Sequence, residues 1–237
     1  MTDMPPLALL AGGRATRLGD LTKSVPKAML EVAGKPFIAH QLRLLRRERV
    51  SRVVICAGYL AEQIEAYVGD GSRFGIPVTY KIDGPKPLGT GGALRAALDV
   101  LGSEFLVMYG DSWLDIPYAP VVESFRQHGQ PALMTVFRNA GQWDMSNVWF
   151  DNGQIRLYDK REHLPQMRYI DWGLGAIRSE VLAARPLGDA FDLGDFYSEL
   201  SRAGRLAGYQ VTTRFYEIGS TNGLRETDAL LRRTQSL

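Results

Sequence analysis

Near its start, the chain places basic side chains directly after two glycines. Gly12 and Gly13 end the short apolar run 7–11, and the basic residues that follow within one loop are Arg14, Arg17, Lys23 and Lys27. Glycines lack a Cβ atom, so the backbone can turn sharply and approach a ligand closely. Arginine binds phosphate with a planar fork and lysine with a mobile point charge. A glycine turn after a buried strand, with cations converging on it, therefore predicts a phosphate-binding site.

A solvated basic loop after an ordinary glycine turn is the alternative, and it would be preferred if the two glycines stood alone. Two better-known phosphate motifs do not fit. A Walker loop needs Gly-Lys-Ser/Thr, whereas Gly19 precedes Asp20 and Leu21. A dinucleotide fingerprint needs a third glycine before a helix, but Arg17 and Leu18 occupy that region.

The whole stretch reads Leu-Ala-Gly-Gly-x-x-Thr-Arg-Leu, then Leu-Thr and Pro-Lys, and it resembles the signature of the sugar-1-phosphate nucleotidyltransferases. The resemblance implies two catalytic residues: Arg17, which grips the phosphates of a nucleotide, and Lys27, which reaches the reacting phosphates. It also implies that the glycine loop wraps the nucleotide through Leu10, Ala11, Gly12, Gly13 and Arg14. Ala15 replaces the glycine that is usual in the family, and a positive φ there would be strained.

A second glycine-rich stretch, 87–94, resembles the family's Pro-Leu-Gly-Thr-x-Gly-Ala-Leu motif, which contacts the base and the ribose. Gly89, Thr90 and Gly91 are therefore further nucleotide-binding candidates. The glycines leave backbone N–H and C=O groups accessible for hydrogen bonds to the edge of a base. The helix that starts here could also direct its N-terminus at the nucleotide. A glycine-rich helix start without a ligand is the alternative.

Two acidic residues are candidates for a magnesium site. Asp111 follows the apolar run 105–109, and a carboxylate at a strand end beside a phosphate loop is well placed to hold Mg²⁺. Glu217 lies in Phe-Tyr-Glu-Ile-Gly-Ser, which resembles the family's late aromatic-x-Asp-Ile-Gly-Thr motif with Glu in place of Asp. The resemblance implies that both acids bind Mg²⁺ as the cofactor. The alternatives are a turn-forming Asp and a surface Glu on an edge strand.

The candidates for substrate binding are Asp83, Lys160, Asp171, Trp172 and Gly173. Lys160 resembles the lysine of the family's Glu-Lys-Pro motif, which contacts the sugar phosphate, although Asp159 and Arg161 replace its neighbours. The Asp-Trp-Gly stretch stands where the family usually has Asn-x-Gly facing the sugar. An aspartate there can accept hydroxyl hydrogens but cannot donate as an amide does, which suggests an unusual or modified sugar. The alternatives are a solvated lysine and a strand-end turn with the tryptophan in the core.

Strands and helices alternate over the first half, which predicts a parallel sheet with ligands at the carboxyl ends of its strands. The elements expected there are helix 36–49, strand 52–57, helix 60–68, strand 78–82, helix 93–101 and strand 105–109. The second half is expected to join the same sheet. Its expected elements are strands 132–137, 147–150, 154–158, 168–177 and 214–218, and helices 179–184, 193–203 and 221–233, the last capped by Thr221.

We therefore expect an α/β fold, a Rossmann-like mixed and mostly parallel sheet flanked by helices, which is the nucleotidyltransferase fold that the resemblance implies. One domain would span residues 1–237, with a nucleotide-binding half of about 1–115 and a sugar-phosphate-binding half of about 116–237. No hexapeptide repeat is present, so the chain is expected to be a stand-alone core enzyme without the β-helix of larger relatives.

Composition excludes several other classes. An apolar fraction of 45% and a charged fraction of 23% are those of a soluble globular protein, and a net charge of +2 does not suggest a nucleic-acid binder. The single cysteine, Cys56, allows no internal disulfide, and no signal peptide or membrane-length apolar run is present. The three histidines lie far apart and no pair has metal-ligand spacing, which argues against zinc chemistry. We expect a cytoplasmic monomer or homodimer that binds neither nucleic acid nor membrane.

The reaction implied by the resemblance joins an NTP and a sugar 1-phosphate, giving an NDP-sugar and pyrophosphate for cell-surface polysaccharide synthesis. Among small members, the chain looks most like the heptose 1-phosphate guanylyltransferases, which implies GTP and D-glycero-D-manno-heptose 1-phosphate. UTP or CTP with another sugar 1-phosphate, such as N-acetylmuramate 1-phosphate, is the alternative. A nucleotide-sugar glycosyltransferase and a non-catalytic nucleotide-binding module stay open as other classes. The glycosyltransferases usually carry Asp-x-Asp, whereas this chain has Asp-Ser-Trp at 111–113.

Overall fold

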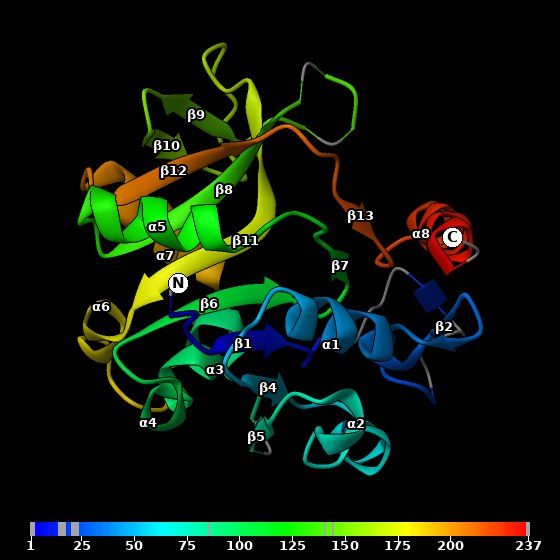
Figure 1. Cartoon of the computed structure of the whole chain (residues 1–237). Coiled ribbons are helices and arrows are strands. Elements are labelled where there is room, and N and C mark those ends of the chain that lie inside the picture. The colour runs from blue at the N-terminus through cyan, green and yellow to red at the C-terminus, as the bar shows by residue number, and fades with distance from the viewer. Residues whose placement is uncertain are drawn as a thin grey trace.

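A nine-stranded sheet forms the centre of the molecule, with strand order β5-β4-β1-β6-β11-β8-β12-β10-β9 (Figure 1). The structure is a computed structural model of the chain, and it describes residues 3–13, 18–19, 24–84, 86–139, 141–143 and 145–235. Helices cover both faces of this sheet, and strands from both halves of the sequence belong to it. The predicted α/β fold class is therefore confirmed.

The first half supplies four neighbouring parallel strands. They are β1 (Leu7–Leu10), β4 (Val53–Ala57), β5 (Val78–Ile82) and β6 (Glu104–Tyr109). Every residue of β1 and β4 is buried, which explains why their sequences read as continuous apolar runs. The four strands expected in this region, at 7–11, 52–57, 78–82 and 105–109, are all present, with bounds that differ from expectation by at most one residue.

The two faces of the sheet have separate cores. On one face, Leu7 and Leu9 of β1 pack with α1 (Phe37–Arg47), α2 (Ala61–Val68) and α5 (Ala119–His128). On the other face, Ala8 and Leu10 pack with α3 (Gly89–Ala96), α4 (Leu98–Leu101), α6 (Ser179–Ala183) and α7 (Leu193–Arg202). The alternation along β1 is that of a strand covered on both sides, because successive side chains point to opposite faces.

The second half extends the sheet through β11 (Tyr169–Arg178), which pairs antiparallel with β6 on one side and with β8 (Ala132–Arg138) on the other. β12 (Leu206–Val211) runs parallel to β8, and the hairpin of β10 (Gln154–Tyr158) and β9 (Val148–Asp151) completes the far edge. Helix α5 and strand β12 are absent from the sequence-based expectation. In β12, Gly208 interrupts the apolar run, and it is required because a Cβ there would lie 2.6 Å from the ring of Phe150.

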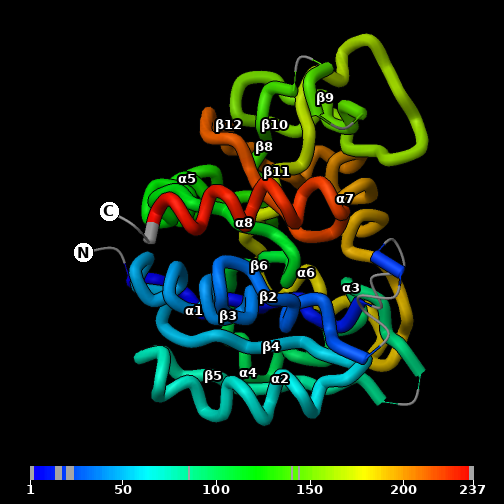
Figure 2. The backbone as a smooth tube through the Cα atoms, turned by 90° about the vertical axis from the view of Figure 1, so that its right-hand side faces the viewer, coloured from blue at the N-terminus to red at the C-terminus, as the bar shows by residue number. Residues whose placement is uncertain are grey.

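Several short elements lie outside the large sheet. They are β2 (Glu31–Val32), β3 (Lys35–Pro36), β7 (Ser112–Trp113) and β13 (Tyr216–Glu217), together with the 3₁₀ turns η2 (Lys27–Met29) and η3 (Ser72–Phe74). The expected strand 214–218 is reduced to β13, which pairs with β7 outside the large sheet. Helix α8 (Thr221–Gln235) packs beside α1 and β2 (Figure 2). Its cap is Ser220 rather than Thr221, because the Ser220 hydroxyl accepts the Gly223 N–H at 2.9 Å.

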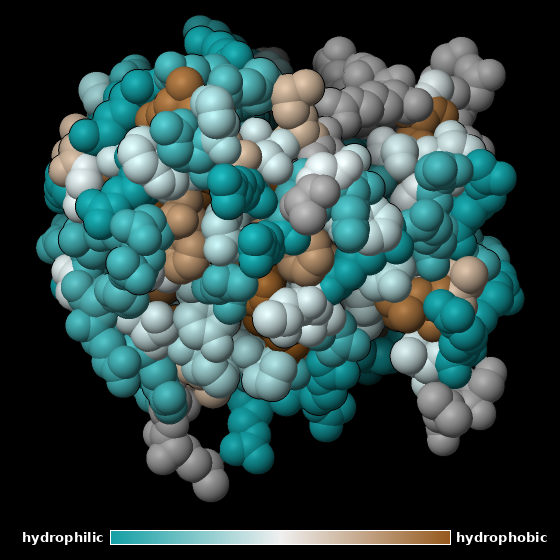
Figure 3. Space-filling model, turned by 90° about the horizontal axis from the view of Figure 1, so that it is seen from above, coloured by the Kyte–Doolittle hydropathy of each residue, from teal (hydrophilic) through white to brown (hydrophobic). Residues whose placement is uncertain are grey.

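The face of the molecule in Figure 3 is mostly hydrophilic, and its hydrophobic residues form small, separate patches. The large hydrophobic side chains with most exposure in the described chain are Ile82, Trp143, Met145 and Leu187. Among the described helices, none combines the length and the apolar character needed to cross a lipid bilayer.

Candidate active site

A cavity of about 570 Å³ lies where the carboxyl ends of β1, β4, β5 and β6 meet the start of α3. Six of the predicted nucleotide-binding residues line it: Leu10, Ala11, Gly12, Gly13, Gly89 and Thr90. The same cavity is lined by Lys27, Asp83 and Asp111. Arg14 and Arg17, two further candidates, lie outside the residues that the structure describes. The position of the cavity is the one expected for a parallel sheet.

The glycines at the cavity have different roles. A Cβ on Gly110 would lie 2.9 Å from the Leu10 carbonyl oxygen, so glycine lets the end of β6 approach the loop after β1. At Gly12, a Cβ would make only ordinary contacts of 3.5 Å or more, and at Gly13 it would meet nothing within 4 Å. Packing therefore requires glycine at position 110, whereas positions 12 and 13 are free of such constraints and face the cavity.

Lys27 and Asp111 form an ion pair, with 2.8 Å between Lys27 Nζ and Asp111 Oδ2. The Lys27 side chain is 21% exposed and that of Asp111 is 29% exposed, so both are partly buried. Gln41 of α1 donates from Nε2 to the carbonyls of Tyr109 and Ser112. These two bonds hold the backbone on either side of Asp111.

Glu217 meets the same two residues at Gly219. A Cβ built on Gly219 would lie 2.7 Å from Glu217 Oε2, 3.3 Å from Asp111 Oδ2 and 3.4 Å from Lys27 Nζ. The strand pairing of β13 with β7 sets this geometry, because the Ile218 N–H donates to the Asp111 carbonyl at 2.9 Å. The Glu217 carboxylate also accepts the Gly219 N–H, and it accepts the Ser220 hydroxyl at 2.6 Å. The structure thus brings together one cation and two carboxylates from segments far apart in sequence.

This donor set fits a magnesium ion. Mg²⁺ is usually held in nucleotide sites by one or two carboxylates, with substrate phosphates and water completing an octahedron. Asp111 and Glu217 supply two carboxylates at one point beside the cavity. Within the described ranges, no group of three or more acidic, histidine or cysteine side chains forms an all-protein metal cage. Two carboxylates would leave the remaining positions around such an ion to substrate and water.

The glycine loop at the start of α3 packs tightly on the segment before α7. The N–H groups of Gly91 and Gly92 both donate to the Phe191 carbonyl, at 2.9 and 3.3 Å, and the Phe191 ring fills the space that a Gly91 Cβ would need. These two N–H groups are therefore not available to read a base edge, and Gly91 does not line the cavity. Helix α3 starts four residues before the expected position because the Phe191 carbonyl satisfies its first N–H groups.

Asp171 and Gly173 lie in a bulge of β11 next to the main cavity. Both line a small hollow that shares Tyr109 with the cavity. The Asp171 carboxylate accepts the Gly173 N–H at 2.9 Å, and Gly173 has a φ of +101°, which favours glycine. Burial raises the pKa of the Asp171 carboxyl, although the Gly173 hydrogen bond and the charge of Lys160 oppose the shift. Asp171 is thus a partly buried acid close to the site.

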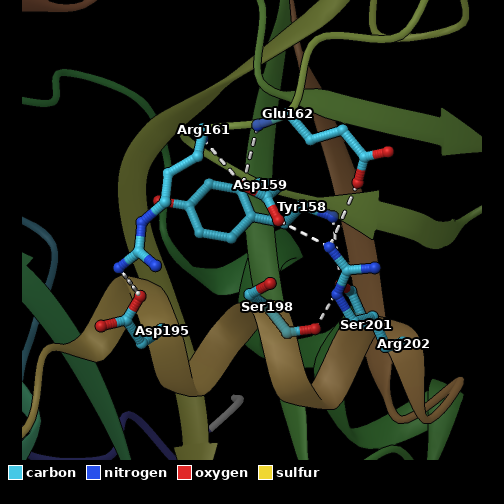
Figure 4. A network of polar contacts seen from close by, with 8 residues as sticks. All are labelled: Tyr158, Asp159, Arg161, Glu162, Asp195, Ser198, Ser201 and Arg202. Atoms are coloured by element: carbon cyan, nitrogen blue, oxygen red, sulfur yellow. Dashed lines mark hydrogen bonds and ion pairs between the residues drawn. The ribbon is translucent and has the colours of Figure 1, made fainter.

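Lys160 follows β10 on a turn that Asp159 fixes (Figure 4). The Asp159 carboxylate accepts the N–H groups of Arg161 and Glu162, at 2.8 and 3.1 Å, and pairs with Arg202 at 2.6 Å. These bonds lower the pKa of Asp159. The two residues that depart from the family's Glu-Lys-Pro motif therefore build this turn. Lys160 itself is exposed, and a Cβ on Gly194 would lie 3.0 Å from its Nζ, so its amine lies at the start of α7.

Trp172 was a candidate for substrate binding, and the structure places its side chain elsewhere. The ring is 1% exposed and belongs to the core that also contains Leu9 and Leu106. Its indole N–H donates to the Thr213 carbonyl at 2.7 Å. The side chain therefore has no surface with which to contact a sugar, and the alternative interpretation of Trp172 as a core residue is the correct one.

If the chain acts on the NTP and the sugar 1-phosphate that the resemblance implies, Asp171→Asn is expected to raise KM for the sugar 1-phosphate by about one to two orders of magnitude, while KM for the NTP stays nearly constant. A carboxylate bond to a hydroxyl is worth roughly 1.5–3 kcal/mol, and about 1.4 kcal/mol corresponds to a factor of ten. The same variant should be at least as stable as wild type at neutral pH. The raised pKa means that Asp171 contributes stability below its unfolded-state pKa, and this contribution is lost as pH rises through the folded-state value.

Initial rates and melting temperatures between pH 4 and pH 8 check this prediction. Asp195→Asn is the matched control, because Asp195 is an exposed acid of α7 paired with Arg161. A variant with lower stability at neutral pH and unchanged KM values would assign Asp171 only to the turn that ends at Gly173.

A family model described as nucleotidyl transferase matches residues 8–146, and the chain therefore belongs to the nucleotidyl transferase family. This confirms both the predicted family and the predicted class of enzyme. A UTP–glucose-1-phosphate uridylyltransferase from Synechocystis is 28% identical over 215 residues, which are 83% of this chain and 55% of that protein. The chain thus spans about half the length of this relative.

Two other comparisons cover nearly the full length of both chains. An N-acetylmuramate alpha-1-phosphate uridylyltransferase from Neisseria meningitidis is 28% identical over 228 residues, which are 94% of this chain and 96% of that protein. The crystal structure of HddC from Yersinia pseudotuberculosis has a TM-score of 0.82 at 21% identity and covers 96% of this chain and 100% of its own. A second structure of HddC, complexed with GMP-PN, has a TM-score of 0.80. These structures share the fold of this chain.

Proposed function

We propose that the protein is a sugar-1-phosphate nucleotidyltransferase, which converts an NTP and a sugar 1-phosphate to an NDP-sugar and pyrophosphate. The observation that carries the proposal is the meeting of Lys27, Asp111 and Glu217 at Gly219, at one end of a nucleotide-sized cavity. The names of the Synechocystis and Neisseria relatives describe the same class of reaction. The cytoplasm is the proposed compartment.

In the proposed reaction, an oxygen of the sugar phosphate attacks the α-phosphorus of the NTP in line and pyrophosphate leaves. Such a reaction depends on positioning and on neutralising charge rather than on an activated nucleophile. Lys27 would stabilise charge on the α-phosphate, and Arg17 would hold the leaving pyrophosphate. Lys160 and Asp171 would bind the sugar phosphate and its hydroxyls. Gly173 lies between the residues proposed to bind the sugar phosphate and those at the metal site. A Cβ built on Gly173 would lie 3.7 Å from Oγ of Ser112, the residue that follows Asp111.

Asp111 and Glu217 are the proposed magnesium ligands. When bound, Mg²⁺ would supply positive charge that neutralises the phosphate oxygens. The protein's own contribution is to fix both carboxylates in advance. The pairing of β13 with β7 holds Glu217, and the Ile218 N–H bond and Gln41 hold the backbone around Asp111.

For the substrates, we propose GTP with D-glycero-D-manno-heptose 1-phosphate. The structural likeness to HddC, one structure of which is complexed with GMP-PN, supports guanine. A second candidate is UTP with N-acetylmuramate 1-phosphate, because the Neisseria relative of that name has nearly the same length as this chain. A glycosyltransferase with Asp-x-Asp is not supported: position 113 is Trp113, 8% exposed, and the second carboxylate comes from β13 instead.

The test is pyrophosphate release from each of GTP, UTP, CTP and dTTP with a set of sugar 1-phosphates, in the presence of Mg²⁺. The proposal expects release that depends on both substrates. Release that needs no sugar 1-phosphate would contradict it, as would transfer of sugar from an NDP-sugar.

A further inference from the structure

Five strands of the second half close into a ring. In this ring β11 pairs with β8, β8 with β12, β12 with β10, β10 with β9, and β9 again with β11 (Figure 1). The pairing of β9 with β11 is limited to Val148 and Tyr169. A closure made by so short a backbone pairing leaves a role for a side chain in holding the two strands together.

Asn147, the residue before β9, makes three hydrogen bonds at this closure. Its N–H donates to the Tyr169 carbonyl at 3.0 Å, and its own carbonyl accepts the Asp159 N–H at 3.0 Å. Its side-chain Oδ1 accepts the Asp171 N–H at 3.2 Å. The backbone of Asn147 thus holds the start of the turn that carries Lys160, while its side chain holds the backbone of Asp171.

The bond to Asp171 falls where that edge of β11 has no neighbouring strand. β6 pairs with β11 only from Leu174 onwards, and β9 pairs with it only at Tyr169. On the opposite edge, the pairing with β8 shifts register between Asp171 and Gly175. A partly buried N–H without an acceptor costs free energy, so the amide oxygen of Asn147 stabilises the bulge in the position from which it presents the Asp171 carboxylate.

We propose that Asn147 is a positioning residue, which sets the place of the Asp171 carboxylate relative to the sugar and acts on the sugar only through Asp171. This deepens the proposed function and rests on it, since the carboxylate has this role only if a sugar 1-phosphate is a substrate. The carbonyl of Asn147 is already bonded to the Asp159 N–H, so the side-chain oxygen is the group that reaches Asp171.

Steady-state kinetics of Asn147→Ala, with a sugar 1-phosphate that supports pyrophosphate release, test the proposal. KM for the sugar 1-phosphate should rise about tenfold, the usual effect of losing one hydrogen bond to a partly buried group, while KM for the NTP stays nearly constant. The two backbone hydrogen bonds of Asn147 do not need its side chain, so the ring should stay closed and Lys160 should stay in place.

Gln154→Ala is the matched control, because Gln154 also ties two strands of the ring through a side-chain amide. Its Nε2 donates to the Leu206 carbonyl at 3.0 Å, at the junction of β10 with β12. This variant should lower the melting temperature without changing either KM. Amide hydrogen exchange at Asp171, followed by NMR, adds a readout without substrate: protection of this N–H should fall in Asn147→Ala and persist in Gln154→Ala.

A double variant shows whether Asn147 acts through Asp171. Asn147→Ala combined with Asp171→Asn should raise KM for the sugar 1-phosphate little beyond the effect of Asp171→Asn alone, because the carboxylate that Asn147 positions is already absent. Effects that multiply in the double variant would overturn the proposal, since Asn147 would then contact the sugar independently of Asp171.

A loss of stability in Asn147→Ala with wild-type KM values would also overturn the proposal and assign Asn147 only to the closure of the ring. The proposed function can fail separately. If wild type releases no pyrophosphate with any sugar 1-phosphate, the reaction is removed and the inference with it. An active wild type with an unaffected Asn147→Ala variant removes the inference alone.

Discussion

Lys27→Ala is expected to lower turnover by about two to three orders of magnitude, the loss typical of one electrostatic stabiliser. The Lys27 amine lies 2.8 Å from Asp111, at the end of the cavity where the two carboxylates meet. It is the cation best placed, among the described residues, to reach a phosphate there. Binding of NTP should weaken less than turnover falls, because the charge on the α-phosphate region grows in the transition state. Steady-state kcat and KM for the NTP measure both effects.

The fold should tolerate the change. Removal of Lys27 leaves Asp111 without this partner, but the Asp111 side chain is 29% exposed and water can solvate it. Lys35→Ala is the matched control, because Lys35 is an exposed lysine of the β2–β3 hairpin. Turnover close to wild type in Lys27→Ala, with an unchanged melting temperature, would remove Lys27 from the mechanism.

Removal of divalent metal with EDTA is expected to abolish activity, and Asp111→Asn and Glu217→Gln should each weaken the apparent affinity for Mg²⁺. Both carboxylates approach one point at Gly219, so the two changes act on one ion. The double variant should therefore lose less than the sum of the single losses, with a coupling of about 0.5–3 kcal/mol. Calorimetric titration of Mg²⁺ into the nucleotide complex measures metal binding independently of turnover.

Asp115→Asn is the control for these variants, because Asp115 is an acid near β7 that pairs with Arg47 on the surface. Glu217→Gln has a further effect, since the Glu217 carboxylate accepts both the Gly219 N–H and the Ser220 hydroxyl. A glutamine amide has only one oxygen for these donors, so some loss of stability is expected in this variant alone. Full additivity, or activity that needs no metal, would count against a shared site.

Much of the fold follows from the sequence because its elements are locally specified. The apolar runs of β1 and β4 and the spacing in α1 and α2 each predict an element without reference to the rest of the chain. Strand β12 is not specified in this way, since glycine at position 208 makes room for the ring of Phe150 on β9, two strands away in the sheet. Helix α5 buries only Val121, Val122 and Phe125, but Pro120 at its start and Gly129 at its end are signals that could have located it.

The features of the candidate site divide in the same way, into those that local motifs predict and those that depend on contacts between distant segments. The carboxyl ends of the first-half strands place Lys27, Asp83 and Asp111 at one cavity, as the motifs indicate. The ion pair between Lys27 and Asp111, the support from Gln41 and the burial of Trp172 depend on contacts between distant segments. The sequence of the glycine loop also could not show whether its backbone N–H groups are free to bind a ligand. The N–H groups of Gly91 and Gly92 donate to the carbonyl of Phe191, which is about 100 positions further along the chain.

The packing of Phe191 against Gly91 has a consequence for recombination among related chains. The ring fills the space that any side chain at position 91 would need, and the Phe191 carbonyl holds the first turn of α3. Consider a chimaera that takes its first 115 residues from one relative and the remainder from another. In it, Gly91 would face whatever residue the other relative has at position 191, or Phe191 would face a residue at position 91 that is bulkier than glycine. Crossovers between the two positions therefore disrupt α3, whereas exchanges that carry both residues together preserve it. Positions 91 and 191 therefore have to be exchanged together, although they belong to halves of the chain that bind different substrates in the proposed reaction.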